Sequence, residues 1–137
     1  MAYKSKLSQY PGSSYEELVR QARIDYHAIH RLTPRRKPYI KSKYFGKEKV
    51  FVNLFWEHLN QKSRNDRRRR LKLFACAIDL IRNSREKPEI IHEAGRPKEI
   101  FYRFQGASND NKLYVVQIKE NKKTKRKYFM SVFPTEK

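Results

Sequence analysis

The segment from Glu99 to Phe133 reads EIFYRFQ-GASNDN-KLYVVQIKE-NKKTK-RKYFMSVF, and it decides the fold. Apolar and polar side chains alternate over residues 99–105, 112–120 and 126–133, as they do in β-strands with one buried face. Gly106–Asn111 has the small and polar composition of a turn, and a lysine-rich turn separates the last two strands. Because both connections are short, we predict an antiparallel meander.

The residues before the meander predict one more strand of the same sheet, a further short strand and two helices. Glu89–Glu93 is the first strand of the four. A short strand at 50–52 leads into a helix over 54–59, which Asn53 can cap. A second helix begins at Asp66, and its apolar residues recur at intervals of three or four, which predicts a wide buried face. These apolar residues are Leu71, Phe74, Ala75, Ile78 and Ile81.

The N-terminal part predicts a separate helix and a linker. Over residues 13–31, either of two serines can cap an amphipathic helix with a glutamate three positions later. Leu32–Pro38 places two prolines around three positive charges, which disfavours helix and strand alike. We divide the chain into an N-terminal helix with a basic linker over 1–49 and an α+β domain over 50–137. The predicted fold is α+β, an N-terminal helix followed by two helices packed on a four-stranded antiparallel sheet.

The chain is strongly basic along its whole length. It has 137 residues, 33 Lys and Arg against 14 Asp and Glu, and a net charge of +19. Such a charge attracts polyanions and gives binding that weakens with salt, so we expect nucleic acid, above all RNA, as the partner. The apolar runs are far shorter than the ~20 residues of a membrane span, and the N-terminus lacks the apolar block of a signal peptide. We therefore expect no membrane partner and a cytoplasmic location.

No pattern in the sequence predicts a metal or a cofactor. Cys76 is the single cysteine, and we expect it on the buried face of the second helix. The Cys and His spacing does not match a zinc site, the carboxylates are scattered, and no P-loop glycine pattern occurs. We therefore expect no cofactor, and a metal nuclease or an NTPase is disfavoured.

Two clusters of basic residues are candidates for contact with the nucleic-acid backbone. Consecutive arginines stand at the start of the second helix, where the helix dipole disfavours positive charge unless an outside anion is present. The other cluster lies in the lysine-rich turn, although lysines at such turns also serve solubility alone. The predicted nucleic-acid-binding residues are Arg64, Arg67, Arg68, Arg69, Arg70, Lys122, Lys123, Lys125, Arg126 and Lys127.

Four further side chains are candidates for catalysis. RNA cleavage without metal needs a base for the 2′-hydroxyl proton, cations for the phosphorane and an acid for the leaving 5′ oxygen. His58 has Lys62 and Arg64 nearby, whose charges would lower its pKa and keep the imidazole neutral. Arg103 stands among aromatic residues and requires an anion, and Ser131 is a hydroxyl between apolar residues. Three of them also have a structural interpretation: His58 as a packed histidine, Arg103 as an ion-paired arginine and Ser131 as a buried hydroxyl with a partner.

The order of these motifs resembles a known superfamily of ribonucleases. From Val50 to Pro134 the chain contains a strand, FWEHL, RRRRLKLFACAIDLIRNS, FYRF, LYVVQIKE and YFMSVFP, in that order. This order resembles the barnase, EndoU, colicin and RelE superfamily, most of all its small phage- and mobile-element-associated members. The resemblance implies a BECR or RelE-like fold and a metal-independent endoribonuclease of toxin or effector type, with an acidic antitoxin or inhibitor protein as partner.

The resemblance also implies roles for three of the candidate residues. His58 would be the family's helix histidine, Arg103 its central-strand basic residue and Ser131 its terminal-strand hydroxyl. Lys62 joins this set from its spacing alone.

Two other functions remain open at this stage. A non-catalytic RNA- or DNA-binding protein could use the same basic surface, with Phe101, Tyr102 and Phe104 as a stacking platform for single strands. Strand alternation puts these rings on both faces, which counts against that function. The arginine-bearing helix could instead enter a DNA major groove, but its buried face leaves few polar side chains to read bases. We therefore favour an endoribonuclease that acts through the 2′-hydroxyl.

Overall fold

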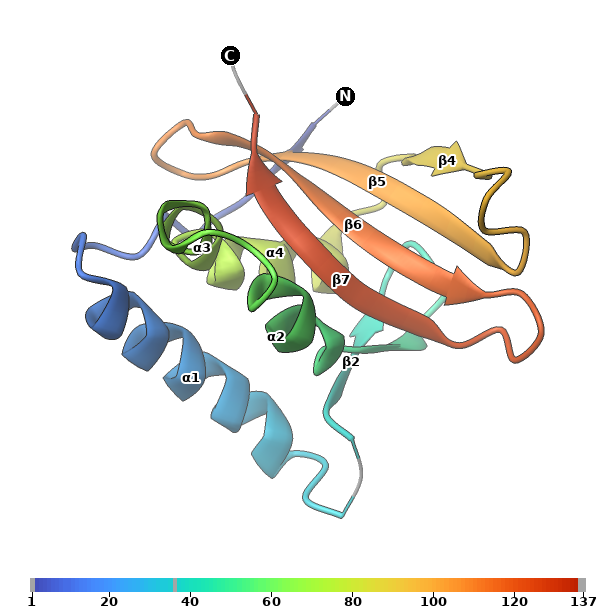
Figure 1. Cartoon of the computed structure of the whole chain (residues 1–137), viewed down its shortest axis with the longest axis horizontal. Coiled ribbons are helices and arrows are strands. Elements are labelled where there is room, and N and C mark those ends of the chain that lie inside the picture. The colour runs from blue at the N-terminus through green and yellow to red at the C-terminus, as the bar shows by residue number, and fades with distance from the viewer. Residues whose placement is uncertain (1, 36, 136–137) are drawn as a thin grey trace.

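The computed structural model describes residues 2–35 and 37–135 and shows helices gathered on one side of a curled sheet (Figure 1). The helices are α1 (Tyr15–Arg31), α2 (Leu54–Leu59), α3 (Arg64–Leu71) and α4 (Phe74–Asn83). The strands are β1 (Tyr3–Lys4), β2 (Tyr39–Ser42), β3 (Glu48–Phe51), β4 (Glu89–Ile91), β5 (Glu99–Ala107), β6 (Leu113–Asn121) and β7 (Lys127–Pro134).

The sheet is larger and more mixed than the sequence predicts, so the prediction of a four-stranded antiparallel sheet under two helices is wrong. Over the described residues, seven strands pair in the order β1-β5-β6-β7-β3-β2, and β4 also pairs with β5. β5, β6 and β7 do form the antiparallel meander. However, β1 pairs with β5 and β3 pairs with β7 in parallel.

Short length and distant pairing hide the additional strands in the sequence. β1 has two residues and β2 has four, which is too few to show a clear alternation. The linker before β2 contains Arg36, which lies outside the described residues. β3 joins the sheet through Val50 and Phe51, which pair with Lys127 and Tyr128 far along the chain. A parallel pair of this kind has no short connection that sequence inspection could detect.

The predicted second helix is in fact two helices. Ser63 caps α3, because its hydroxyl oxygen accepts a hydrogen bond from the Asp66 amide at 3.2 Å. The chain leaves α3 after Leu71 and enters α4 at Phe74. This short step keeps the buried residues at helical spacing, so periodicity alone does not reveal the break. None of the helices over the described residues has both the length and the apolar character that a membrane span requires.

The core lies between the helices and the sheet. Phe55 of α2 stacks on Phe129 of β7, with ring centroids 5.0 Å apart and an interplanar angle of 12°. Phe74 of α4 lies 5.1 Å from Phe55. Leu18 of α1 and Ile40 of β2 belong to the same buried cluster. Residues before 50 therefore contribute to the same core and sheet as the residues after it. The division of the chain into an N-terminal part over 1–49 and a domain over 50–137 stays a prediction.

We call the face of the sheet that is turned away from this core the open face. In β6, Val116 and Ile118 are buried in the core, whereas the side chains of Gln117 and Lys119 are partly exposed on the open face. A bulge between Gln117 and Ile118 leaves Met130 of β7 without a partner in the pairing. α2 packs beside β7 just beyond the end of β3. Side chains of α2 can therefore reach the open face past the edge of β7.

Candidate active site

His58 lies in a recess where α2 meets the open face of the sheet. The recess has a volume of about 240 Å³ and combines side chains of α2, β6, β7 and the loop before β5. Its lining residues are Leu54, Glu57, His58, Gln61, Arg96, Lys119 and Met130. The strand-to-helix step at Asn53 places α2 here, since the helix begins three residues after β3 ends. The recess therefore joins an imidazole with two cations from distant parts of the sequence.

Burial lowers the pKa of His58 below its ordinary value, and three nearby cations lower it further. The cations are Lys62, Arg70 and Lys119. The predicted effect of Lys62 on the pKa is confirmed, although burial is the larger cause and Arg64 is not among the contributing groups. A lowered pKa keeps the imidazole neutral at pH 7, so that it can accept a proton.

Glu99 fixes the two cations of the recess. Arg96 Nε donates to one oxygen of its carboxylate at 2.5 Å, and Lys119 Nζ lies 3.3 Å from the other oxygen. The hydrogen bond from Arg96 lowers the pKa of Glu99, with a further contribution from Lys119. Because Glu57 also lines the recess, Glu57 and Glu99 together balance the charges of Arg96 and Lys119, and Lys62 and Arg70 are the further cations that act on His58. Sequence inspection missed Glu99, Arg96 and Lys119, because nothing in the local pattern indicates that they meet.

A row of polar residues crosses the open face next to the recess. In the strand register Arg103 of β5 is paired with Gln117 of β6, and Gln117 with Ser131 of β7. Arg103 Nε donates to Gln117 Oε1 at 2.9 Å. The predicted residues Arg103 and Ser131 thus lie on the same face with Gln117 between them. Gln117 is a member that the sequence analysis missed, although its position in the alternation of β6 already indicates the open face.

Arg70 connects this row to the recess. Its Nη1 donates to Ser131 Oγ at 2.6 Å, and its Nε donates to Asp66 Oδ2 at 3.1 Å. Its guanidinium lies 5.4 Å from the centroid of the Phe133 ring. Arg70 thus contacts Ser131 directly and is one of the cations that lower the pKa of His58. Arg103 is not among the residues that line the recess or shift the pKa of His58.

The other arginines around α3 have partners within the protein. Arg64 pairs with Glu16 of α1 at 2.6 Å. Arg67 donates to the carbonyl oxygens of Asn60 and Lys62 at 2.8 and 2.9 Å, which satisfies the end of α2. The guanidinium of Arg68 donates to the side chain of Asn65, and Arg69 lies 3.5 Å from Asp66. Of the four consecutive arginines, Arg69 has a side chain that is still 56% exposed.

The lysine-rich turn divides into an exposed tip and a buried base. Lys122, Lys123, Lys125 and Arg126 are exposed. Lys127 is buried instead, and its Nζ lies 2.5 Å from Glu48 and 3.7 Å from Glu120. Its charge is therefore balanced inside the protein, whereas the tip is open to a ligand.

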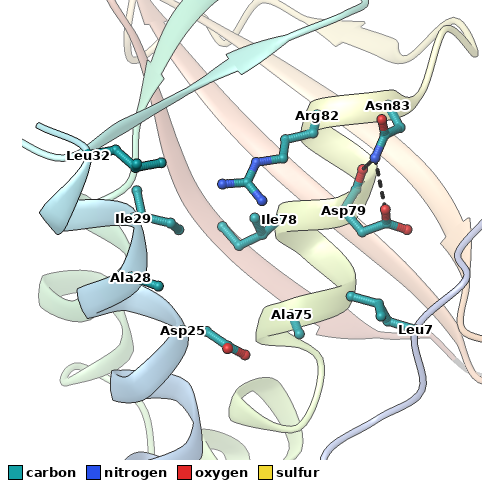
Figure 2. Close-up of a pocket in the computed structure, with 10 residues that line it drawn as sticks. All are labelled: Leu7, Asp25, Ala28, Ile29, Leu32, Ala75, Ile78, Asp79, Arg82 and Asn83. Atoms are coloured by element: carbon teal, nitrogen blue, oxygen red, sulfur yellow. Dashed lines mark hydrogen bonds between the residues drawn. The ribbon is translucent and has the colours of Figure 1, made fainter.

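A second cavity lies between α1 and α4, away from the recess (Figure 2). It has a volume of about 290 Å³, and Asp25, Asp79 and Arg82 are its charged lining residues. Asp79 accepts hydrogen bonds from Tyr3, Ser5 and Asn83 at 3.0, 2.7 and 2.9 Å, and Asp25 accepts one from Tyr10. These bonds tie the N-terminal segment to the helices. The cavity shares no lining residue with the recess of His58.

Within residues 2–35 and 37–135, no group of three or more His, Cys, Asp or Glu side chains is placed to hold a metal ion. Cys76 is buried in α4, as the sequence predicts, and burial raises the pKa of its thiol to about 11.

Comparisons with protein-family models, with curated proteins and with solved structures found no match to this chain. Its function is therefore inferred from the geometry of the recess and of the open face.

Proposed function

We propose that this protein is a small endoribonuclease that cleaves RNA through attack by the 2′-hydroxyl on the adjacent phosphate and needs no metal ion. One observation carries the proposal: His58, with a lowered pKa, lies in a recess beside Arg96 and Lys119. A neutral base next to fixed positive charge is the combination that this reaction requires. The net charge of +19 adds attraction for a phosphate polymer.

In the proposed reaction His58 accepts the 2′-hydroxyl proton while the 2′ oxygen forms a bond to phosphorus. Lys119 and Arg96 stabilise the negative charge that develops on the phosphorane. The bond from phosphorus to the 5′ oxygen then breaks, and the leaving oxygen takes a proton from the Lys119 ammonium. The products are a 2′,3′-cyclic phosphate and a 5′-hydroxyl end.

The neighbouring cations have supporting roles in this proposal. Arg103 contacts a phosphate beside the scissile one, and Arg70 holds the buried Ser131 hydroxyl in place. Together with burial, Lys62 helps to lower the pKa of His58 and so to keep the ring neutral. The exposed members of the two basic clusters, Arg69 and the lysines of the turn, hold RNA further from the recess.

The test is cleavage of a fluorescent single-stranded RNA in the presence of EDTA. Wild-type protein should cleave it, and His58→Ala should lower the rate by about 100-fold or more, the scale of losing a general base. His30→Ala is the matched control, because His30 is an exposed histidine of α1 outside the recess. A substrate with a 2′-deoxyribose at the cleaved position should stay intact.

Two results would contradict the proposal in different ways. Wild-type protein that binds the RNA and leaves it intact with EDTA is not a metal-independent ribonuclease. If cleavage survives His58→Ala in a protein whose circular dichroism matches the wild type, His58 is not the base.

The same proposal includes a location and a partner. It places the protein in the cytoplasm, where RNA would be accessible to it. The net charge of +19 favours an acidic protein as its inhibitor.

A further inference from the structure

Three aromatic residues from three strands form a row on the open face. The strand register pairs Tyr39 of β2 with Phe51 of β3, and Phe51 with Tyr128 of β7. Their neighbours Ile40, Val50 and Phe129 are buried in the core. Because side chains alternate along a strand, the three rings lie on the opposite face. All three are partly exposed. They are called the aromatic row.

The rings contact one another and carry cations at both ends of the row. The ring centroids of Tyr39 and Phe51 are 6.0 Å apart, and those of Phe51 and Tyr128 are 5.8 Å apart. Lys49 Nζ lies 4.8 Å from the centroid of Tyr39, and Lys119 Nζ lies 5.9 Å from that of Tyr128. Aromatic rings interleaved with cations are the elements of surfaces that bind single-stranded nucleic acid.

The aromatic row leads directly to the recess of His58. Lys119 is paired with Tyr128 in the register and also lines the recess. Leu54, which follows Phe51 by three residues at the start of α2, lines the recess as well. A strand of RNA whose bases lie on the row would therefore bring its phosphates to Lys119 and His58.

We propose that the aromatic row is a stacking surface that selects single-stranded RNA for the recess; this inference rests on the function proposed above. Unpaired bases can place their faces on Tyr39, Phe51 and Tyr128, whereas the bases of a duplex are already stacked inside the helix. Stacking of this kind tolerates any base, because every base has a flat π-face. The substrate class is single-stranded RNA with little sequence preference at the positions on the row.

The aromatic row replaces the platform that the sequence suggests. Phe101 is 4% exposed, with the Arg96 guanidinium 5.7 Å from its ring centroid. Phe104 belongs to the core, and Tyr102 packs against it while its hydroxyl donates to Glu120 at 2.7 Å. Phe101 and Phe104 are buried and Tyr102 packs against the core, whereas the three rings of the aromatic row are partly exposed.

The experiment measures binding without cleavage. The probe is a fluorescein-labelled eight-nucleotide 2′-O-methyl RNA of mixed sequence, used alone and as a duplex with its complement, followed by fluorescence anisotropy at fixed salt. We expect the single strand to bind more tightly than the duplex. Tyr128→Leu should weaken binding of the single strand by about 5-fold or more, whereas Tyr128→Trp, which keeps an aromatic ring, should retain it. Tyr15→Leu is the matched control, because Tyr15 lies under the guanidinium of Arg64 outside the row.

The outcomes separate this inference from the proposed function, because the probe lacks the 2′-hydroxyl that cleavage needs. The stacking surface is refuted if the duplex binds as tightly as the single strand, or if Tyr128→Leu and Tyr15→Leu have equal effects. Selective single-strand binding lost in Tyr128→Leu supports it, even if wild-type protein cleaves no RNA. In that case the ribonuclease proposal fails and the binding surface stands.

Discussion

Two runs of basic residues look alike in the sequence: Arg67–Arg70 on α3 and Lys122–Lys127 around the β6–β7 turn. The last residues of the two runs, Arg70 and Lys127, differ in their contacts. The side chain of Arg70 is 14% exposed and that of Lys127 is 8% exposed, and both hold carboxylates. Arg70 reaches the open face and donates to Ser131, whereas Lys127 turns toward the core between Glu48 and Glu120. Adjacent residues of one run thus differ in burial and in contacts according to their place on the fold.

This comparison shows that the net charge overstates the charge that a ligand meets. A cation held by a buried carboxylate contributes to specificity of packing, whereas an exposed cation mainly attracts polyanions. The neighbours of each side chain decide between these roles, and a run of basic letters does not reveal them. Four substitutions test the distinction.

Lys127→Met should have the largest effect on stability. It leaves the buried carboxylate of Glu120 without its cation, and breaking a buried ion pair from one side costs about 3 kcal/mol. Urea unfolding at pH 7 measures the loss, and Lys123→Met at the exposed tip should stay within about 0.5 kcal/mol of wild type. If the two variants are equally stable, the hydrogen bond from the Tyr102 hydroxyl is enough to stabilise the buried Glu120 carboxylate.

Arg70→Met should destabilise the protein by about 1–3 kcal/mol, because it removes a charged donor from the buried Ser131 hydroxyl and from Asp66. The matched control is Arg69→Met, whose side chain is 56% exposed. Thermal or urea unfolding compares them. If both variants lose the same stability, the distinction between the buried and exposed ends of the arginine run is wrong.

Lys119→Gln should raise the pKa of His58 toward its ordinary value of about 6.5, because it removes one of the cations that favour the neutral ring. The wild-type ring stays neutral to a lower pH, so the acidic limb of the wild-type cleavage rate should lie below pH 6.5. NMR titration of the His58 ring measures the shift directly, with Lys122→Gln as control. An unchanged pKa would place Lys119 too far from His58 to act on it.

Arg69→Gln should have the smallest effect, with stability within about 0.5 kcal/mol of wild type. If Arg69 contacts a phosphate, the slope of log affinity for RNA against log salt should fall by about one. Anisotropy titrations at several salt concentrations measure the slope. An unchanged slope would remove Arg69 from the nucleic-acid surface.

Long regular segments could be predicted from the sequence, and short or distant pairings could not. The meander showed itself because β5, β6 and β7 have eight or nine residues each and short connections. α1 was also predictable, and Ser14 caps it as one of the two expected serines. The parallel β3–β7 pair and the break between α3 and α4 escaped, because neither changes the local spacing of apolar residues.

The candidate site was predictable only residue by residue. Ser131 stood out as a hydroxyl between apolar residues, which needs a partner, and His58 stood out because Lys62 and Arg64 are near it in the sequence. The groups around them come from elsewhere in the chain. Lys119, which Glu99 holds, lines the recess of His58, and Arg70 donates to Ser131. The aromatic row depends on the register of three strands, two of which pair in parallel, so no local pattern could indicate it.

The parallel pairing of β3 with β7 also governs when the molecule becomes competent during folding. It closes a long loop, whose entropic cost is repaid only after the helices and the meander between the two strands have formed. We therefore expect Phe51 to meet Tyr128 late in folding and the contact of Arg70 with Ser131 to form no earlier than β7 docks. A partly folded chain has neither the aromatic row nor the recess. In the proposed ribonuclease, the capacity to damage RNA would thus arise only with the finished fold.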